Sequence, residues 1–213
     1  MNTLLGIERD IFNCSAVVEK YFVFLDMFRA RKDPLIANLV LTDVEFLFSN
    51  IRSLYDSLQF LTADILRRSD VCKSANLPRS FADLAKLEKE ELRQKYRLPE
   101  PLMQFYIDTK NFFVACREIR GGFQHQRIDI TVLYCLDEGF ALQKETPFFE
   151  DPVVARFNIW PSRKIKEGVL VSLLALIAFL NSAVIAHTDA LSNALETSFT
   201  QPQPIVKDYL AFL

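Results

Sequence analysis

The chain has 213 residues, of which 50% are hydrophobic, and a formal net charge of −2 at pH 7. This length and apolar content are enough to form a buried core, and no Pro-, Gly- or Ser-rich linker interrupts the chain, so a single domain over residues 1–213 is predicted. The slightly negative charge excludes a global positive field that would hold a long nucleic acid through counterion release. Any nucleic-acid site must therefore be a local basic patch.

The content of glycine and of aromatic residues points to helices. The chain has only 5 glycines but 19 phenylalanines. Few glycines mean few tight turns, and many large side chains suit packed helices better than a turn-rich β-fold. We therefore expect an all-α protein.

Two long helices are predicted in the first third of the chain. Over 4–29, apolar residues recur at spacings of three and four, which is typical of one face of an amphipathic helix. The predicted apolar stripe consists of Leu5, Ile11, Phe12, Val18, Phe22, Leu25 and Phe28. Pro34 restricts the residue before it and suits a first helical turn, so a second helix is expected over 35–68.

A charged insertion separates these helices from a third. Residues 69–99 have prolines towards both ends, which indicates a loop with one or two short surface helices. A third helix is predicted over 102–121, with an apolar side formed by Phe105, Phe112, Phe113 and Cys116. The pair Gly121-Gly122 should distort or end it, since each glycine costs about 1 kcal/mol relative to alanine inside a helix.

The last third contains a predicted hairpin, a predicted fourth helix and an apolar tail. Alternating apolar residues around Asp137-Glu138-Gly139 predict a small β-hairpin over 130–144. A fourth helix is expected over 162–197. The tail, residues 200–213, ends in several apolar side chains, and we expect it to pack back on the protein or to bind a neighbour.

The uncharged run over 168–186 is long enough to span a membrane. Polar residues interrupt it, and the charged residues Asp189 and Glu196 continue the same helix. A central helix of a bundle must also be apolar all round, so a buried core helix is preferred. A protein with one spanning helix at 168–186 stays as an alternative. The N-terminal residues lack the basic start and apolar run of a signal peptide, so a cytoplasmic protein without membrane contact is expected.

Common catalytic and metal templates are not found in the sequence. The four cysteines lack the close spacing of a zinc site, and we expect reduced, mostly buried thiols. No HExxH, CxxC, GxSxG, P-loop or dinucleotide motif occurs, so neither a metal nor a cofactor is predicted. One of the two histidines, His187, follows the apolar run and is interpreted as a hydrogen-bonded histidine at the edge of the core.

The other histidine lies in a basic cluster. In the segment CREIRGGFQHQR, Arg117, Arg120 and Arg127 surround His125, and Gln124 precedes it. A guanidinium grips phosphate through paired hydrogen bonds, and an imidazole that titrates near neutrality can move protons. The alternative is a solvated helix end whose arginines pair with nearby carboxylates, those of Asp43, Glu45, Asp56 or Glu118.

The run Arg120-Gly121-Gly122-Phe123-Gln124-His125 resembles the motif of the HEPN superfamily, an Arg followed by four to six residues and a His. The order of predicted elements over about residues 4–197 is also similar to that family. The resemblance implies a four-helix bundle, with the insertion after the second helix and the hairpin after the third as additions.

Many HEPN proteins are metal-independent ribonucleases in which the motifs of two protomers meet at a dimer interface. The resemblance implies that Arg120 holds the scissile phosphate and that His125 assists proton transfer as the RNA 2′-hydroxyl attacks. Arg117, Gln124 and Arg127 would then bind the substrate. A toxin or defence effector, held in check by an antitoxin or another regulatory protein, is one expected setting.

A second interpretation follows from Gly121. Family members that cut RNA usually have a polar residue, commonly Asn or Asp, directly after the Arg, whereas this chain has glycine there. The alternative is therefore a catalytically silent HEPN-like module that binds RNA, nucleotide or a protein partner.

Overall fold

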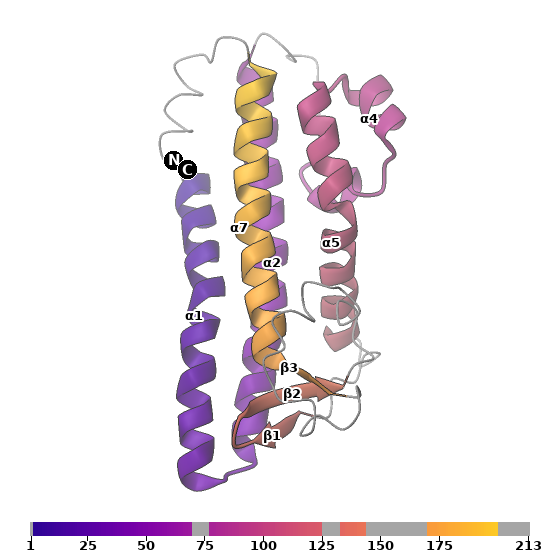
Figure 1. The fold of residues 1–213 in the computed structure, drawn as a ribbon. Helices are drawn as coiled ribbons and strands as arrows, with labels where there is room; N and C mark the ends of the chain where they lie inside the picture. The colour runs from indigo at the N-terminus through magenta and orange to yellow at the C-terminus, as the bar shows by residue number, and fades with distance from the viewer. Residues whose placement is uncertain (1, 70–76, 125–132, 144–169, 200–213) are drawn as a thin grey trace. The chain divides into compact units, whose positions relative to one another are not determined.

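The structure, a computed structural model, describes residues 2–69, 77–124, 133–143 and 170–199. These described residues are predominantly α-helical, as the composition predicts, and include one small sheet (Figure 1). In chain order the elements are α1 (Asn2–Arg31), α2 (Leu35–Arg68), α3 (Phe81–Leu84), α4 (Lys89–Tyr96), α5 (Glu100–Gln124), β1 (Tyr134–Leu136), β2 (Gly139–Gln143), β3 (Leu170–Ser172) and α7 (Leu173–Ser198).

The ends of α1 and α2 have local causes. Lys32 has a φ of 52°, and its backbone N–H bonds to the carbonyl of Phe28 at 2.7 Å, which closes the last turn of α1. Asp33 then accepts a hydrogen bond from the backbone N–H of Leu35 at 2.9 Å, so its carboxylate satisfies a free donor at the start of α2. Both helices match their predicted ranges to within two residues.

Contacts divide the chain into two compact units. Unit 1 comprises Met1–Ile11, Ile51–Val114 and Val184–Leu213, and unit 2 comprises Phe12–Asn50 and Ala115–Ala183. The four long helices α1, α2, α5 and α7 each contribute residues to both units.

Unit 1 is built around buried aromatic side chains. Tyr55 of α2 lies 4.9 Å from Phe81 of α3, measured between ring centroids, and Phe81 lies 4.8 Å from Phe113 of α5. Asp56 accepts hydrogen bonds from the hydroxyl of Ser80 and from the backbone N–H of Phe81, both at 3.0 Å. The insertion thus contains two short helices, as predicted. The first of them, α3, is held against α2 by packing of buried rings and by the hydrogen bonds of Asp56 at its N-terminus.

Unit 2 contains the sheet, whose strand order is β1-β2-β3 with antiparallel pairing throughout. The β1-β2 hairpin and its Asp137-Glu138 turn are as predicted. At that turn, Arg29 Nε donates to the carbonyl of Asp137 at 2.8 Å, and Lys32 forms an ion pair with its carboxylate. The backbone N–H of Phe140 donates to the hydroxyl of Tyr21 at 3.1 Å. The end of α1 therefore holds the hairpin.

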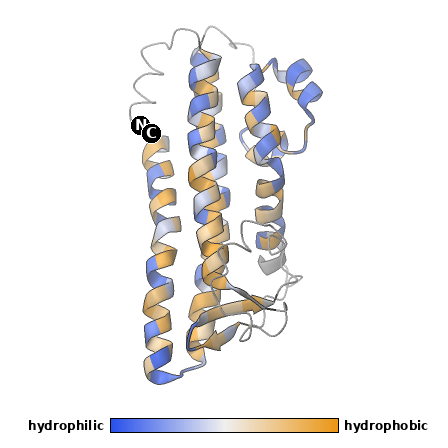
Figure 2. Ribbon diagram, in the orientation of Figure 1, coloured by the Kyte–Doolittle hydropathy of each residue, from blue (hydrophilic) through white to orange (hydrophobic). Residues whose placement is uncertain are grey.

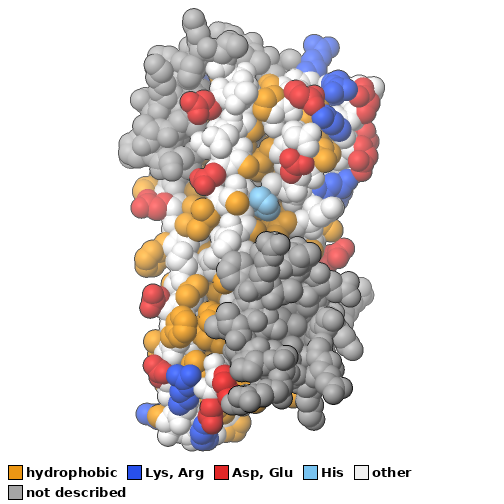
Figure 3. Space-filling view, viewed as in Figure 1, with side chains coloured by type: hydrophobic (Ala, Val, Ile, Leu, Met, Phe, Trp, Pro, Cys, Tyr) orange, Lys and Arg blue, Asp and Glu red, His pale blue; other side chains and the backbone are white. Residues whose placement is uncertain are grey.

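The predicted apolar stripe of α1 is wrong. Of its seven residues only Leu25 is buried, whereas Leu5, Phe12 and Phe22 are exposed. The side chains that are buried repeat every three or four residues one position away from the predicted stripe: Ile7, Asp10, Cys14, Val17, Tyr21 and Leu25. Because α1 carries apolar residues on several sides, periodicity alone did not identify the face that packs. Figure 3 shows hydrophobic side chains reaching the surface along α1.

The predicted fourth helix begins later than expected. Within the apolar run 168–186, Leu170–Ser172 form the strand β3, which pairs with β2, and α7 starts only at Leu173. Figure 2 shows that the part of α7 next to β3 is hydrophobic. Leu173, Leu176 and Leu180 are buried there, as predicted.

By length and composition, α7 is apolar enough to cross a membrane, and 44% of its most apolar 18-residue window is buried. The part of the predicted span that is helical, residues 173–186, covers about 21 Å, whereas a hydrocarbon core is about 30 Å thick. The helix itself continues to Ser198, so a core helix and a spanning helix both stay open as interpretations.

Candidate functional site

The candidate site is at the end of α5 that belongs to unit 2. Arg117 and Arg120 are three residues apart, so they lie on neighbouring turns of the same side of the helix. Arg117 is exposed, whereas Arg120 is half-buried and its Nε atom is buried. Cys116, one turn before Arg120, and Ile119 are buried. Arg117 therefore lies at the surface of the helix, whereas the side chain of Arg120 is partly packed.

Gly121 does not end or distort the helix, contrary to expectation, because α5 continues to Gln124. The cost of about 1 kcal/mol for a helical glycine is small beside the burial of Phe112, Phe113 and Cys116 on the same helix. A Cβ atom added at Gly121 would meet no atom within 4 Å. Packing therefore does not require glycine at this position.

The other predicted site residues have no described side chains. Gln124 is the last residue of α5, and only its backbone is described. His125 and Arg127 lie outside the described residues. Of the predicted site residues, the structure thus brings together Arg117 and Arg120.

The predicted acidic partners of the arginines are partly engaged elsewhere. Asp43 pairs with Lys20 at 2.9 Å, and Asp56 lies 3.9 Å from Arg52 and caps the start of α3. Within the described part of the chain, Arg117 forms no ion pair with these residues or with any other carboxylate. Among the described residues, therefore, no carboxylate neutralises its charge.

A structural role for these arginines also has a physical basis. Cations near the C-terminal end of a helix are stabilised by its macrodipole, typically by about 0.3–1 kcal/mol. Arg120 lies one residue before the last turn of α5. Stabilisation of the helix end and phosphate binding are compatible, because the same guanidinium groups can interact with the last carbonyls of the helix and with a bound phosphate.

His187, in unit 1, has a well-defined environment. Its Nδ1 atom is hydrogen-bonded to the hydroxyl of Tyr55, and its ring lies 5.0 Å from the ring of Phe112, edge to face. Burial lowers the pKa of His187, and the carboxylate of Asp108 opposes this shift. The prediction of a hydrogen-bonded histidine at the edge of the core is confirmed. Tyr55 was not predicted as its partner, because no local sequence signal connects two residues so far apart in the chain.

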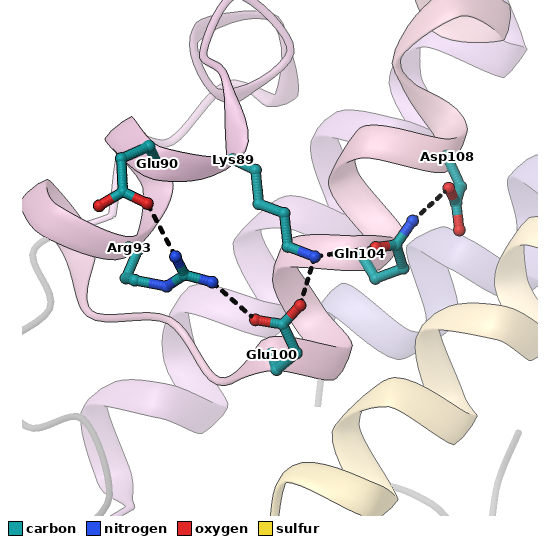
Figure 4. Close-up of polar contacts among 6 residues, drawn as sticks. All are labelled: Lys89, Glu90, Arg93, Glu100, Gln104 and Asp108. Atoms are coloured by element: carbon teal, nitrogen blue, oxygen red, sulfur yellow. Dashed lines mark hydrogen bonds and ion pairs between the residues drawn. The ribbon is translucent and has the colours of Figure 1, made fainter.

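The densest polar cluster that sequence reasoning missed joins α4 to α5 (Figure 4). Glu100 accepts hydrogen bonds from Arg93, at 3.1 Å, and forms an ion pair with Lys89. These two cations lower the pKa of Glu100, with Lys89 making the larger contribution. Arg93 also donates to Glu90 at 2.7 Å. Because these charges are paired and exposed, the cluster fastens α4 and offers no free group for chemistry.

The three described cysteines do not have the environment of a nucleophile. Cys14 and Cys116 are buried, and burial raises the pKa of Cys116 well above its usual value. Burial also raises the pKa of the half-buried Cys135. Such thiols stay protonated near neutral pH and are poor nucleophiles. Cys72 lies outside the described residues, and among those described no three His, Cys, Asp or Glu side chains gather to hold a metal.

Comparisons with protein-family models, with characterised proteins and with solved structures find no match to this chain. The resemblance to the HEPN superfamily therefore rests on the Arg120 to His125 motif and on the order of the helices.

Proposed function

We propose that this protein is a metal-independent endoribonuclease of HEPN type, with Arg120 and His125 as its catalytic residues. The observation that carries the proposal is the pair Arg117 and Arg120 on one side of α5, directly before His125, where Arg117 has no carboxylate partner among the described residues. Two cations so placed favour a bound phosphodiester.

The proposed reaction needs no metal and no cofactor. The RNA 2′-hydroxyl attacks the adjacent phosphorus while His125 takes up its proton, and the bond to the 5′-oxygen of the next nucleotide breaks. Arg120 stabilises the negative charge that develops on the phosphoryl oxygens. The 5′-oxygen leaves with a proton from water, and the other product carries a 2′,3′-cyclic phosphate. Arg117, Gln124 and Arg127 bind the RNA backbone on either side.

Helix geometry limits how the two catalytic groups cooperate. Five positions along a regular helix separate two residues by about 7.5 Å of rise and about 140° of rotation. Since α5 passes Gly121 as a helix, Arg120 and a histidine on a continuation of that helix would face different sides. The proposal therefore includes a homodimer in which Arg120 of one protomer and His125 of the other act on one phosphate.

The unbroken helix also favours a second candidate function. A silent HEPN-like module would bind RNA, nucleotide or a protein partner through Arg117 and Arg120 without cleaving it. Glycine at position 121 agrees with this alternative, because no polar side chain follows Arg120. In either case we propose a cytoplasmic protein, with an antitoxin or another regulatory protein as a partner.

The deciding experiment incubates the protein with labelled single-stranded RNA in EDTA and analyses the products for 2′,3′-cyclic phosphate. Arg120→Gln should abolish cleavage, whereas Arg31→Gln, which removes an exposed arginine of α1, should not. Arg120-dependent binding of RNA without cleavage by the wild-type protein would support the silent module. The absence of both cleavage and binding would refute both functions.

A further inference from the structure

The outward side of α2 in unit 2 carries an apolar surface that is separate from the core. Leu35, Leu39 and Phe46 are 66%, 47% and 41% exposed, and Thr42, which lies between the last two, is also exposed. At about 100° per residue, these four positions fall within roughly 60° of rotation around the helix. We call this set the α2 outer stripe.

The stripe cannot be explained by the packing of α2 in its own unit. The core-facing side is formed by Ile36, Val40, Val44 and Leu47, which are all buried and lie roughly opposite. A surface helix needs only one apolar side, and its other side is normally polar. Beyond Phe46, the same side of α2 carries Ser49, so within unit 2 its apolar part is confined to residues 35–46.

Thr42 is adapted to an apolar surface. Its hydroxyl donates a hydrogen bond at 2.9 Å to the carbonyl of Asn38 on the preceding turn. The polar group is therefore satisfied within α2, and covering it costs less than covering a hydroxyl that depends on water.

We propose that the α2 outer stripe is the interface between two copies of this chain, with the two α2 helices antiparallel around a two-fold axis. The spacing of the four residues is four, three and four, which reads the same in both directions. A two-fold axis between Leu39 and Thr42 therefore pairs the residues of the two stripes. Leu35 lies against Phe46 of the partner subunit, and Leu39 lies against Thr42 of the partner subunit. A two-fold interface requires this self-complementarity.

The sizes of the facing side chains also agree. The large Phe46 meets Leu35 near each end of the contact, and the small Thr42 meets Leu39 near the axis, so the two helices can approach closely in the middle. Asp43 borders the stripe but is paired with Lys20 at 2.9 Å, and the Lys20 ammonium lies 5.5 Å from the centre of the Phe46 ring. The carboxylate of Asp43 therefore does not enter the interface as an isolated charge.

The available area predicts a weak dimer. Three large side chains exposed to this extent offer on the order of 300 Å² of apolar surface per copy. With the polar neighbours included, two copies bury roughly 1,000 Å², which is at the lower limit for a specific interface. A dimer that dissociates in the micromolar range is expected.

This interface does not depend on the proposed ribonuclease function, whose dimer contact involves α5. If only the stripe is used, the protein is a dimer; if both surfaces are used, it is a tetramer. Substitution of the stripe halves the mass in either case. Cleavage of RNA is measured separately, so failure of one proposal can be told from failure of the other.

The test is sedimentation velocity of the full chain over a range of micromolar concentrations. Leu39→Glu should weaken self-association at least tenfold, because it places a carboxylate in each central layer. Thr42→Leu should strengthen it several-fold by filling the same layer. Phe22→Glu is the matched control, because Phe22 of α1 is 47% exposed but outside the stripe, and self-association should persist.

Three outcomes would overturn the proposal. The wild-type protein could remain monomeric at all concentrations, or associate with the same strength after both α2 substitutions. In the third, the monomer binds phospholipid vesicles and Leu39→Glu abolishes that binding, which would identify a membrane surface as the occupant of the stripe. A circular dichroism melt of Leu39→Glu establishes that the variant is folded, and Thr42→Leu provides an independent readout.

Discussion

The hydroxyl of Tyr55, a fully buried residue of α2, is hydrogen-bonded to Nδ1 of His187 on α7. The two residues are 132 positions apart in the chain. This bond and the nearby ring of Phe112 hold the imidazole in a partly desolvated site in unit 1. Because burial disfavours the charged imidazolium, the stability of the fold should depend on pH in a defined direction.

We predict that unfolding becomes easier as the pH falls below 6.5. The folded-state pKa of His187 is lowered, so in this pH range the unfolded chain binds more protons than the folded one. The contribution of the neutral histidine is fully present above the unfolded pKa of about 6.5 and is lost as the pH falls through that value towards the folded pKa. Urea unfolding between pH 8 and pH 5.5, at about half-unit steps, measures this loss.

Two substitutions separate His187 from the other titrating groups. His187→Gln should flatten the pH dependence of the free energy of unfolding in this window, and His125→Gln measures the contribution of the second histidine separately. If the free energy of unfolding falls equally steeply with decreasing pH in the wild-type protein and in His187→Gln, His187 does not cause the pH dependence.

A second prediction concerns the buried hydrogen bonds that hold the insertion. The hydroxyl of Tyr106 donates to the side-chain oxygen of Gln59 at 2.6 Å, and Gln59 donates to the carbonyl of Pro78 at 2.9 Å. Tyr106→Phe leaves a buried acceptor on Gln59 without its donor, and should lower the free energy of unfolding by about 1–3 kcal/mol. Chemical denaturation measures the change.

The double variant Tyr106→Phe/Gln59→Leu provides the control. It removes both polar partners, so it should be less destabilised than the sum of the two single variants. Additive losses would mean that the hydrogen bond between the two side chains contributes little.

Much of the fold could be predicted because its signals are local. The positions of proline and glycine, together with the spacing of apolar residues, predicted both ends of α2 and located the insertion and the hairpin. The packed face of α1 could not be found in this way, because apolar side chains such as Phe12 and Val17 occur on different sides of it and only the tertiary structure buries one of them. The strand β3 was missed for a similar reason. An apolar run next to a helix has no period of its own, and pairing with β2 decides its conformation.

For the candidate site, the sequence indicated residue types but not their geometry. Arginines beside a histidine suggested phosphate chemistry, and the structure places Arg117 and Arg120 on one side of α5. The course of the helix past Gly121 was not predictable from propensity, because a cost of about 1 kcal/mol is outweighed by burial elsewhere on α5. The bond between Tyr55 and His187 depends on long-range packing, for which the sequence has no local signal.

A third prediction uses the open space beside Gly121. Since an added Cβ meets no atom within 4 Å, Gly121→Ala should raise the free energy of unfolding by about 0.5–1 kcal/mol through helix propensity alone. Gly121→Asn should be tolerated equally well in packing terms, and it places an amide directly after Arg120. If the proposed ribonuclease is limited by glycine at this position, Gly121→Asn increases cleavage and Gly121→Ala does not. Equal effects of the two variants on cleavage would refute a role for the amide.

The final prediction tests the assignment of Arg120 and His125. His125→Ala and Arg120→Ala should each remove most cleavage of single-stranded RNA in EDTA, because the first removes the proton acceptor and the second removes the charge that stabilises the transition state.

Arg120 is half-buried, so truncation to alanine also removes packing of its stem, and a loss of activity alone would not distinguish catalysis from stability. Arg120→Lys resolves this, since it keeps an aliphatic stem and a positive charge but cannot form the paired hydrogen bonds of a guanidinium. We expect this variant to melt close to the wild-type temperature and to cleave RNA at least tenfold more slowly. If instead Arg120→Lys retains full cleavage, or if His125→Ala and Arg120→Ala both lower the melting temperature by several degrees, the segment has a structural role, in which the arginines stabilise the end of α5.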